Sequence, residues 1–291
     1  MKRRSGSSRN NDRTGQILGE RFQLVSLLGR GGQSAVYQAR DLKDGDDVAI
    51  KVLVQSADQD SQERMFREAF AMSQLLGTAA VRILAQSRTD DGMMALVMEL
   101  LHGRDLGAEL AQHKERGEVF PLQRIEETFA PIVSTLESAH AQGLVHRDLK
   151  PENIFLVAPE KGGGVRLLDF GFVKLTRSRA ITGTDNLAGS PSYISPEAWL
   201  HGSSAVGPAT DIYSLAVVLF QVLSGTVPFR GQTFEIMRDV TTAPRPSLHA
   251  LRPDLPSDID DWTQQALAIS PAHRFTKITA MWRALLSSLS G

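Results

Sequence analysis

The sequence predicts an α+β fold in two parts, the first built mainly from strands and the second mainly from helices. Two observations predict this order. Short runs of strand-like residues, separated by glycine-containing turns, fill most of the first hundred residues. After residue 103 the apolar residues recur with helical spacing in longer segments. Strands followed by helices are typical of an α+β chain, and the joint is expected near residues 99–103.

The composition excludes several classes of function and of site. The chain has 291 residues, of which 42% are hydrophobic, so it can bury a sizeable core. Its 32 basic and 33 acidic residues give a formal charge of −1, which argues against nucleic-acid binding because that needs a basic surface. Cysteine is absent, which excludes disulfides, thiolate zinc sites and cysteine nucleophiles.

The beginning of the chain predicts a tail rather than a signal or an anchor. Residues 1–15 are rich in Ser, Asn, Gly and Arg, and we expect a flexible basic tail there. No apolar segment follows the first basic residues, so they do not form a secretory signal. The longest apolar-rich stretch, residues 212–223, is too short to span a bilayer and predicts a buried helix. We therefore expect no membrane segment and a cytoplasmic chain.

The elements follow in order. Strands are expected at residues 22–28, 35–39, 48–54, 81–87, 93–98, 154–157 and 165–168. Helices are expected at residues 62–76, 106–116, 122–142, 211–224, 233–241, 259–268 and 278–288.

A glycine cluster lies between the first two strands. Gly29, Gly31 and Ser34 occupy the positions of a G-x-G-x-x-G pattern, with serine in place of the third glycine. A dinucleotide fingerprint needs a helix after the glycines, but a strand follows here, which disfavours that interpretation. The pattern alone is satisfied by an ordinary hairpin turn. A hairpin tip without side chains can also lie over a phosphate chain and offer N–H groups to it.

A lysine ends the apolar part of the third strand. In Val48-Ala49-Ile50-Lys51 the lysine is either an edge residue that reaches solvent or a cation directed at phosphates. The expected helix that follows carries Glu68, which could pair with it. Neither residue decides the matter alone.

A dense polar run decides between the structural and the phosphate-binding interpretations. His146-Arg147-Asp148-Leu149-Lys150-Pro151-Glu152-Asn153 follows a helix and precedes a strand, and Asp169-Phe170-Gly171 follows the next strand. Asp and Asn oxygens at strand ends are ligands that Mg²⁺ prefers, with phosphate oxygens completing its shell. Two ordinary loops with capping aspartates would not account for the whole string.

With these motifs in family order, together with Ser195-Pro196-Glu197, the sequence resembles the eukaryotic-type (Hanks-type) serine/threonine protein kinases, in particular their bacterial branch. The resemblance covers residues from about 22 to 288. It implies a bilobal protein kinase fold, with a small antiparallel-sheet N-lobe carrying one main helix and a larger, mostly helical C-lobe. The implied kinase domain spans residues 16–288, divided into an N-lobe (16–98), a hinge (99–103) and a C-lobe (104–288).

The resemblance assigns catalysis to five residues, with Mg²⁺ (or Mn²⁺ as a substitute) and ATP as cofactors. Asp148 would accept the proton of the substrate hydroxyl, and Lys150 would lie beside the γ-phosphate. Lys51 would bind the α- and β-phosphates, while Asn153 and Asp169 would hold the metal.

The resemblance also implies the nucleotide contacts. The glycine-rich hairpin would cover the phosphates, the hinge would meet the adenine, and one aspartate would reach the ribose. These residues are Leu28, Gly29, Arg30, Gly31, Gly32, Gln33, Ser34, Val36, Ala49, Lys51, Glu68, Met98, Glu99, Leu101, Asp105 and Phe155.

Further matches imply regulation and architecture. Thr182 and Thr184 match the pair that bacterial relatives often autophosphorylate, and Arg147 and Lys174 match the residues that receive the phosphate. An unmodified polar loop is the plainer alternative. The remaining matches are interpreted as structural: Glu197 and Arg274 as a buried ion pair, and Asp211 as a brace for the catalytic loop.

Three functions are compatible with a kinase-like fold. The leading hypothesis is an ATP-dependent serine/threonine kinase acting on proteins in signal transduction. A pseudokinase serving as an ATP-binding scaffold is the main alternative, although such proteins generally lack the equivalents of Lys51, Asp148 or Asp169. A small-molecule kinase of the same superfamily is disfavoured because Lys150 and the Ser-Pro-Glu segment are present. By family analogy alone, the chain is also compatible with a homodimer.

Overall fold

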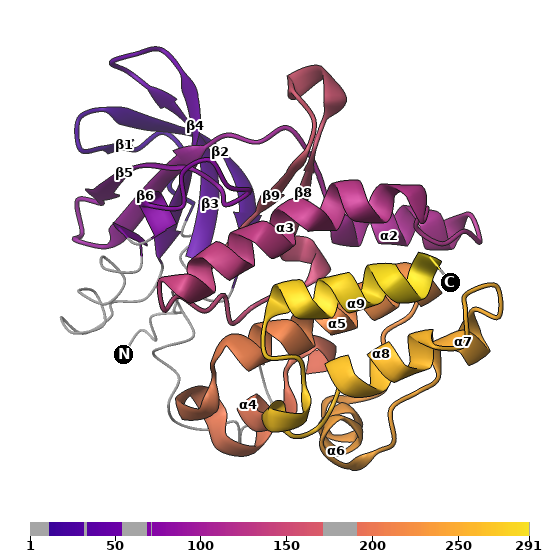
Figure 1. Ribbon diagram of the computed structural model, residues 1–291. Coiled ribbons are helices and arrows are strands. Elements are labelled where there is room, and N and C mark those ends of the chain that lie inside the picture. Colours follow the sequence, from indigo (N-terminus) through magenta and orange to yellow (C-terminus); the bar gives the residue numbers. More distant parts are fainter. Residues whose placement is uncertain (1–11, 32–33, 54–68, 71, 171–190, 291) are drawn as a thin grey trace, which may run out of the picture. The chain divides into compact units, whose positions relative to one another are not determined.

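The computed structural model describes residues 12–31, 34–53, 69–70, 72–170 and 191–290. These residues form two compact units. The first unit contains the described residues of Met1–Ser56 together with Ile83–Leu100, and the second contains those of Ala57–Arg82 and Leu101–Gly291. Each unit has a sheet of its own (Figure 1).

The first unit is a six-stranded antiparallel sheet with the order β1-β2-β3-β4-β6-β5. Its strands are β1 (Ile17–Leu18), β2 (Phe22–Arg30), β3 (Ser34–Asp41), β4 (Asp47–Leu53), β5 (Ile83–Arg88) and β6 (Met94–Glu99). Hairpins connect β2 to β3 and β3 to β4, so the first long strands pair with their neighbours in sequence.

Alternation along these strands separates a core face from a second face. Tyr37 and Ile50 are fully buried on the core face, where they pack with other apolar side chains of the unit. Because side chains point to opposite faces at successive positions, the residues next to them in sequence belong to the other face. Lys51 is one of these, so the core of the first unit does not include it.

A smaller antiparallel sheet, with the order β7-β8-β9, belongs to the second unit. Its strands are β7 (Gly103–Asp105), β8 (Ile154–Val157) and β9 (Val165–Leu167). Gly103 has a φ of +146°, and a Cβ at this position would lie 2.0 Å from the carbonyl oxygen of Leu156. Only glycine therefore fits where β7 meets β8.

Helices make up most of the described part of the second unit (Figure 1). The α-helices that lie wholly within the described residues are α2 (Leu106–Glu115), α3 (Gln123–Ala141), α4 (Pro196–His201), α5 (Pro208–Ser224), α6 (Thr233–Thr242), α7 (Leu248–Leu251), α8 (Ile259–Ala266) and α9 (Ile278–Ser290). Helix α5 is buried along nearly its whole length and contacts α7, α8 and α9. It begins with Pro208 in its first turn and ends at Gly225, whose φ of +75° suits the left-handed cap.

The long predicted elements are confirmed, with bounds that differ from the prediction by at most three residues. Helix α5 begins three residues before the predicted start, and β5 begins two residues after it. The predicted helix over 62–76 lies mostly outside the described residues, although 69–70 and 72–73 are helical. Short elements such as β1, β7, α4 and α7 were not predicted.

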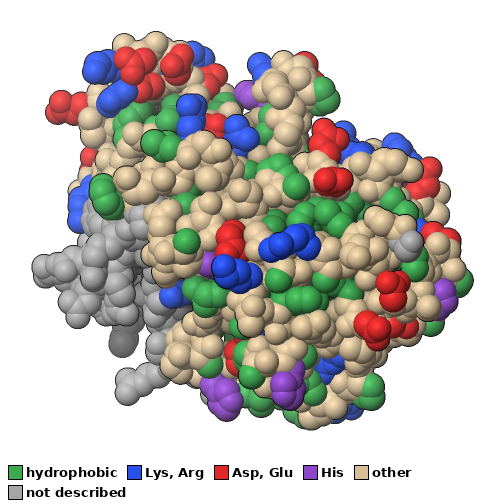
Figure 2. Space-filling model, in the orientation of Figure 1, with side chains coloured by type: hydrophobic (Ala, Val, Ile, Leu, Met, Phe, Trp, Pro, Cys, Tyr) green, Lys and Arg blue, Asp and Glu red, His purple; other side chains and the backbone are tan. Residues whose placement is uncertain are grey.

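Acidic and basic side chains are interspersed on the face drawn in Figure 2. Within the described ranges, no helix combines the length and the apolar character that crossing a bilayer requires.

Candidate active site

Several residues predicted to bind nucleotide share one face of the first unit's sheet. Val36 pairs with Gly29 on one side and with Lys51 on the other. Two positions from Lys51 on the same strand, Ala49 pairs with Met98. Directly paired residues lie on the same face of a sheet, and so do residues two apart on one strand. These five therefore line a single face, opposite the apolar core, and Lys51 on that face is only 6% exposed.

The glycine-rich segment is a hairpin, as the flanking strand patterns predicted. The N–H of Gly31 donates to the carbonyl of Ser34 at 2.8 Å, where β2 gives way to β3. A Cβ added at Gly29 would meet no described atom within 4 Å. Packing within the first unit therefore does not demand glycine at position 29, which leaves close approach of a ligand as a reason for it. Gly32 and Gln33 lie outside the described residues, as does Glu68.

In the second unit, the buried carboxylate of Asp211 organises the loop that carries the polar run. Its Oδ2 accepts the main-chain N–H of His146 at 2.8 Å, and its Oδ1 accepts that of Arg147 at 2.9 Å. The Nε2 of His140, on α3, donates to the same Oδ2 at 2.8 Å. Asp211 is fully buried, so these bonds satisfy a charge that is shielded from water. The bracing geometry expected of Asp211 is present.

His146 is a buried structural residue. Its Nε2 donates to the carbonyl of Leu168 at 2.8 Å, and its Nδ1 accepts the N–H of Asp148 at 3.3 Å. These two bonds require the neutral ring with its proton on Nε2. Burial lowers the pKa of His146, which favours the same neutral form. The centroid of the His146 ring also lies 4.6 Å from that of Phe170, so His146 packs against the residue that follows Asp169.

Asp148, Lys150 and Asn153 lie together at the end of this loop. The Nζ of Lys150 is 3.3 Å from Asp148 Oδ2, and both side chains are about one-fifth exposed. The Nδ2 of Asn153 donates to the carbonyl of Asp148 at 2.7 Å and reaches its Oδ2 at 3.3 Å. The N–H of Leu168 donates to the carbonyl of Asn153 at 2.8 Å, which brings the residue before Asp169 to the same place.

Two non-glycine residues of the loops have positive φ. Arg147 has a φ of +68° and Asp169 a φ of +50°. Such a conformation costs about 1–3 kcal/mol each and persists where surrounding contacts enforce it. Strained backbone clusters at functional sites, and both residues immediately adjoin or belong to the predicted catalytic set.

Asp105 and Phe155 lie opposite each other in the β7–β8 pair. The Oδ1 of Asp105 accepts the N–H of Ala108 at 2.8 Å and so caps the N-terminus of α2. This capping role was not predicted, although an aspartate just before a helical pattern is its usual signal. Of the expected hinge residues, Glu99 ends β6 and Leu101 follows outside any strand.

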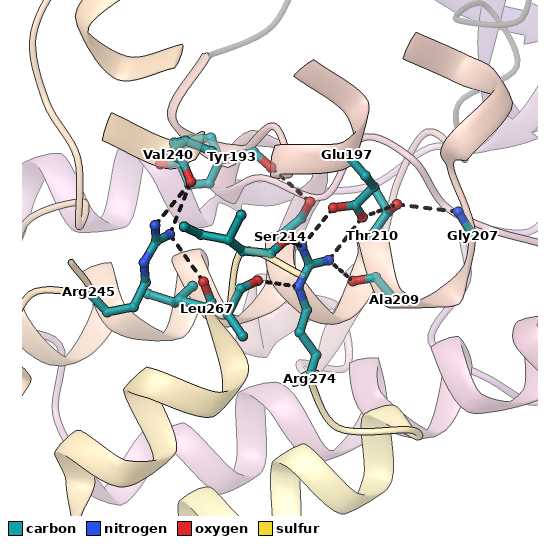
Figure 3. A network of polar contacts seen from close by, with 12 residues as sticks. Tyr193, Glu197, Gly207, Ala209, Thr210, Ser214, Val240, Arg245, Leu267 and Arg274 are labelled. Atoms are coloured by element: carbon teal, nitrogen blue, oxygen red, sulfur yellow. Dashed lines mark hydrogen bonds and ion pairs between the residues drawn. The ribbon is translucent and has the colours of Figure 1, made fainter. Parts of the chain in front are cut away.

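Glu197 and Arg274 form a buried, two-pronged ion pair (Figure 3). Nη2 of Arg274 lies 2.7 Å from Oε2 of Glu197, and Nη1 lies 2.9 Å from Oε1. Thr210 also donates to Oε1 at 2.9 Å. Burial alone would raise the pKa of Glu197, but Arg274 holds that pKa below its usual value. The pair ties α4 to the segment before α9.

Lys174, Thr182 and Thr184 lie outside the described residues. His140 and His146 stand six positions apart, a spacing that does not place two side chains on one face of a helix. The structure shows that both reach Asp211, a convergence that no local spacing could have revealed.

Comparisons with known proteins agree with this geometry. Residues 22–286 match the protein kinase domain family. The chain is 33% identical over 282 residues to a probable serine/threonine-protein kinase PknB of Lactococcus lactis, covering 95% of this chain and 43% of that protein. It is 36% identical over 272 residues to the serine/threonine-protein kinase PknA of Mycobacterium tuberculosis, covering 90% of this chain and 60% of PknA.

A solved structure is similar as well. The kinase domain of PknI from Mycobacterium tuberculosis superposes with a TM-score of 0.73 at 25% identity, covering 96% of this chain and 99% of that one. The chain thus spans about half the length of the two curated relatives, and almost all of a kinase domain. It belongs to the protein kinase family, in the bacterial serine/threonine branch.

Proposed function

We propose that this chain transfers the γ-phosphoryl group of Mg-ATP to serine or threonine hydroxyls of proteins. The arrangement of Asp148, Lys150 and Asn153 carries the proposal, because Asp211 fixes the loop that presents them. Phosphoryl transfer depends mainly on positioning and on neutralising charge, and a rigid loop with one carboxylate and one ammonium group suits both needs.

Asp148 orients the substrate hydroxyl. Its carboxylate is partly exposed, so an incoming hydroxyl can donate to it. The hydroxyl oxygen forms the new bond to the γ-phosphorus while the bond to the leaving ADP breaks, and the hydroxyl proton passes to Asp148. Lys150, 3.3 Å from that carboxylate, supplies positive charge beside the transferred group.

Asn153 and Asp169 would hold the metal. Asn153 Nδ2 is engaged with Asp148, which fixes the amide so that Oδ1 points elsewhere and can serve as an oxygen ligand. The bond from Leu168 to Asn153 fixes the chain just before Asp169. An amide and a carboxylate oxygen fit Mg²⁺, which keeps several waters and phosphate oxygens in its shell. When bound, Mg²⁺ would neutralise charge on the phosphates; Mn²⁺ is the expected substitute.

The first unit would supply the phosphate and adenine contacts. Lys51 lies on the same sheet face as Val36 and Ala49, so one ligand could meet the cation and the apolar side chains together. The hairpin at Gly29 would offer backbone N–H groups to the phosphates.

Autophosphorylation would regulate the enzyme. Phosphate on Thr182 or Thr184 would pair with Arg147 and Lys174 and order the segment that carries it. Arg147 is held by Asp211 in a fixed backbone conformation, which suits a receptor for a phosphate. Replacing both threonines with alanine is expected to lower activity severalfold, and undiminished activity would remove this part of the proposal. The homodimer expected by family analogy remains a prediction.

The function is tested by incubation with labelled ATP, Mg²⁺ and a generic basic protein. We expect label in the basic protein with the wild type and none with Lys51→Met. Wild-type ATP binding by thermal shift without any label transfer, even after treatment with an active kinase, would favour the scaffold alternative.

A further inference from the structure

A buried arginine outside the predicted site, Arg245, ties two helices together (Figure 3). It follows α6 in sequence and is only 8% exposed. Its guanidinium donates to the carbonyls of Val240 and Ala243, at the end of α6, and to that of Leu267, at the end of α8. These distances range from 2.7 to 3.2 Å.

The environment of this guanidinium is unusual for a cation. Burial lowers the pKa of Arg245, and the nearby Arg274 lowers it further, while the Tyr213 hydroxyl raises it. The hydrogen bonds of its guanidinium given above go to main-chain carbonyl oxygens and not to a carboxylate. Burying a cation against carbonyl oxygens alone costs stability, and an apolar side chain of similar volume would avoid that cost.

The same guanidinium reaches the segment before α4 through one intermediate residue. It lies over the ring of Phe229, 4.8 Å from the centroid. The carbonyl of Phe229 accepts the hydroxyl of Ser192 at 3.3 Å. Ser192 is the middle residue of the 3₁₀ turn η4 (Pro191–Tyr193).

The other side of η4 is held by α5. The hydroxyl of Ser214 donates to the carbonyl of Tyr193 at 2.8 Å, and the hydroxyl of Tyr193 donates to Gln221 at 2.5 Å. The turn η4 is thus clamped between α5 and Phe229. Since Arg245 fixes the ring of Phe229, removal of its guanidinium would loosen one side of the clamp only.

We propose that Arg245 is a positioning residue for the protein substrate. Through Phe229 it fixes one side of η4, and the other side is held by Ser214, one helical turn from Asp211 on α5. Because Asp211 braces the loop that carries Asp148, η4 lies beside the loop where the proposed kinase function places the substrate hydroxyl. The inference rests on that function. If Arg245 only held α6 to α8, its removal would lower stability without raising KM for the protein substrate more than KM for ATP.

Steady-state kinetics of Arg245→Met separate these roles, with the concentrations of myelin basic protein and of ATP varied independently. We expect KM for the basic protein to rise about fivefold, the effect of about 1 kcal/mol of lost positioning. KM for ATP and kcat should stay within about twofold, because the catalytic loop is held by Asp211 instead. Thr242→Ala is the matched control: Thr242 lies at the same end of α6, and its hydroxyl donates to the carbonyl of Arg238 within that helix. It should leave both KM values unchanged.

A double-mutant cycle tests the connection through Phe229. Arg245 contacts the ring of Phe229 and Ser192 contacts its carbonyl, so the changes caused by Arg245→Met and Ser192→Ala should add if the two residues act separately. We expect the double variant to raise KM for the basic protein no more than the larger single change. Additive effects, or equal increases in both KM values, would overturn the proposal.

Hydrogen exchange gives a readout that does not need activity. In Arg245→Met, amides of residues 192–195 should exchange faster while those of residues 154–157 stay unchanged. If Arg245→Met does not fold, Phe229→Leu removes the ring and keeps the carbonyl, and should give the same pattern. Unchanged exchange at 192–195 in a folded variant would contradict the proposal, whether or not the wild type phosphorylates the basic protein.

Discussion

Asp211 accepts the main-chain N–H of Arg147 at 2.9 Å, although 64 positions separate the two residues. Arg147 has a left-handed backbone, with a φ of +68°, and directly precedes Asp148. A fully buried carboxylate on the central helix α5 therefore holds a strained residue beside the proposed catalytic aspartate. Strain of this kind persists only where other contacts enforce it.

Asp211→Asn tests this brace. The amide oxygen can accept only one of the main-chain N–H groups of His146 and Arg147, and the amide NH₂ would face the other. We therefore expect the free energy of unfolding to fall by about 2–4 kcal/mol. We expect kcat to fall more than tenfold, since positioning provides much of the catalysis. Asp239→Asn, at a surface pair with Arg238, is the control and should change stability by less than about 0.5 kcal/mol. An unchanged kcat for Asp211→Asn would contradict the bracing role.

Arg147 offers a direct test of the strain. Glycine adopts positive φ without penalty, whereas alanine does not, so Arg147→Gly should be more stable than Arg147→Ala by about 1 kcal/mol. Glu127, exposed within α3, should show the opposite order, because glycine weakens a helix by about 1 kcal/mol relative to alanine. Denaturant unfolding of the four variants measures both differences, and the same order at both positions would refute the strain.

The first unit should respond to acid through Asp41. The Arg21 guanidinium donates to this carboxylate at 2.6–2.9 Å and holds its pKa at about 2, below its ordinary 3.8. A carboxyl whose pKa is lower in the folded state stabilises the fold above about pH 4 and loses that contribution as pH falls toward 2. The Tm difference between wild type and Arg21→Gln should therefore be larger at pH 7 than at pH 3. A difference that grows on acidification would contradict the assignment.

Gly103→Ala tests the contact between β7 and β8. The added Cβ would clash with the carbonyl of Leu156, so we expect a loss of more than about 3 kcal/mol of stability or a failure to fold. Gly117→Ala is the control, because Gly117 also has positive φ but a Cβ there meets no described atom within 4 Å. Its cost should be the backbone penalty of about 1 kcal/mol. Equal losses at the two positions would show that the close approach is unimportant.

The sequence predicted best those features that rest on periodicity. Helix α9 and strand β8 appear where the spacing of apolar residues predicted them. Helix α5 began at Asp211 in the prediction because that residue opens the apolar run, whereas Pro208 in fact begins the helix. Strands of two or three residues, such as β1 and β7, are too short to show any period.

Features that depend on distant contacts were beyond the sequence. The pairing of Arg274 with Glu197 and the bracing by Asp211 were expected only from the resemblance, because residues 64 to 77 positions apart leave no local signal. The capping by Asp105 does have a local signal, but the resemblance assigned this residue to the nucleotide contacts instead. Arg245 has none, because its partners are main-chain carbonyls, which every sequence provides.

Intact-mass measurement of autophosphorylation with Mg²⁺ and ATP, on wild type and Asp148→Asn, tests the central claim most directly. Asparagine keeps the shape of the loop but cannot take the hydroxyl proton. We predict that the wild-type mass increases by one or more phosphoryl groups and that the mass of Asp148→Asn stays unchanged. Equal mass gain in both proteins would contradict the role of Asp148, and no gain in wild type, even after treatment with an active kinase, would contradict the proposed activity.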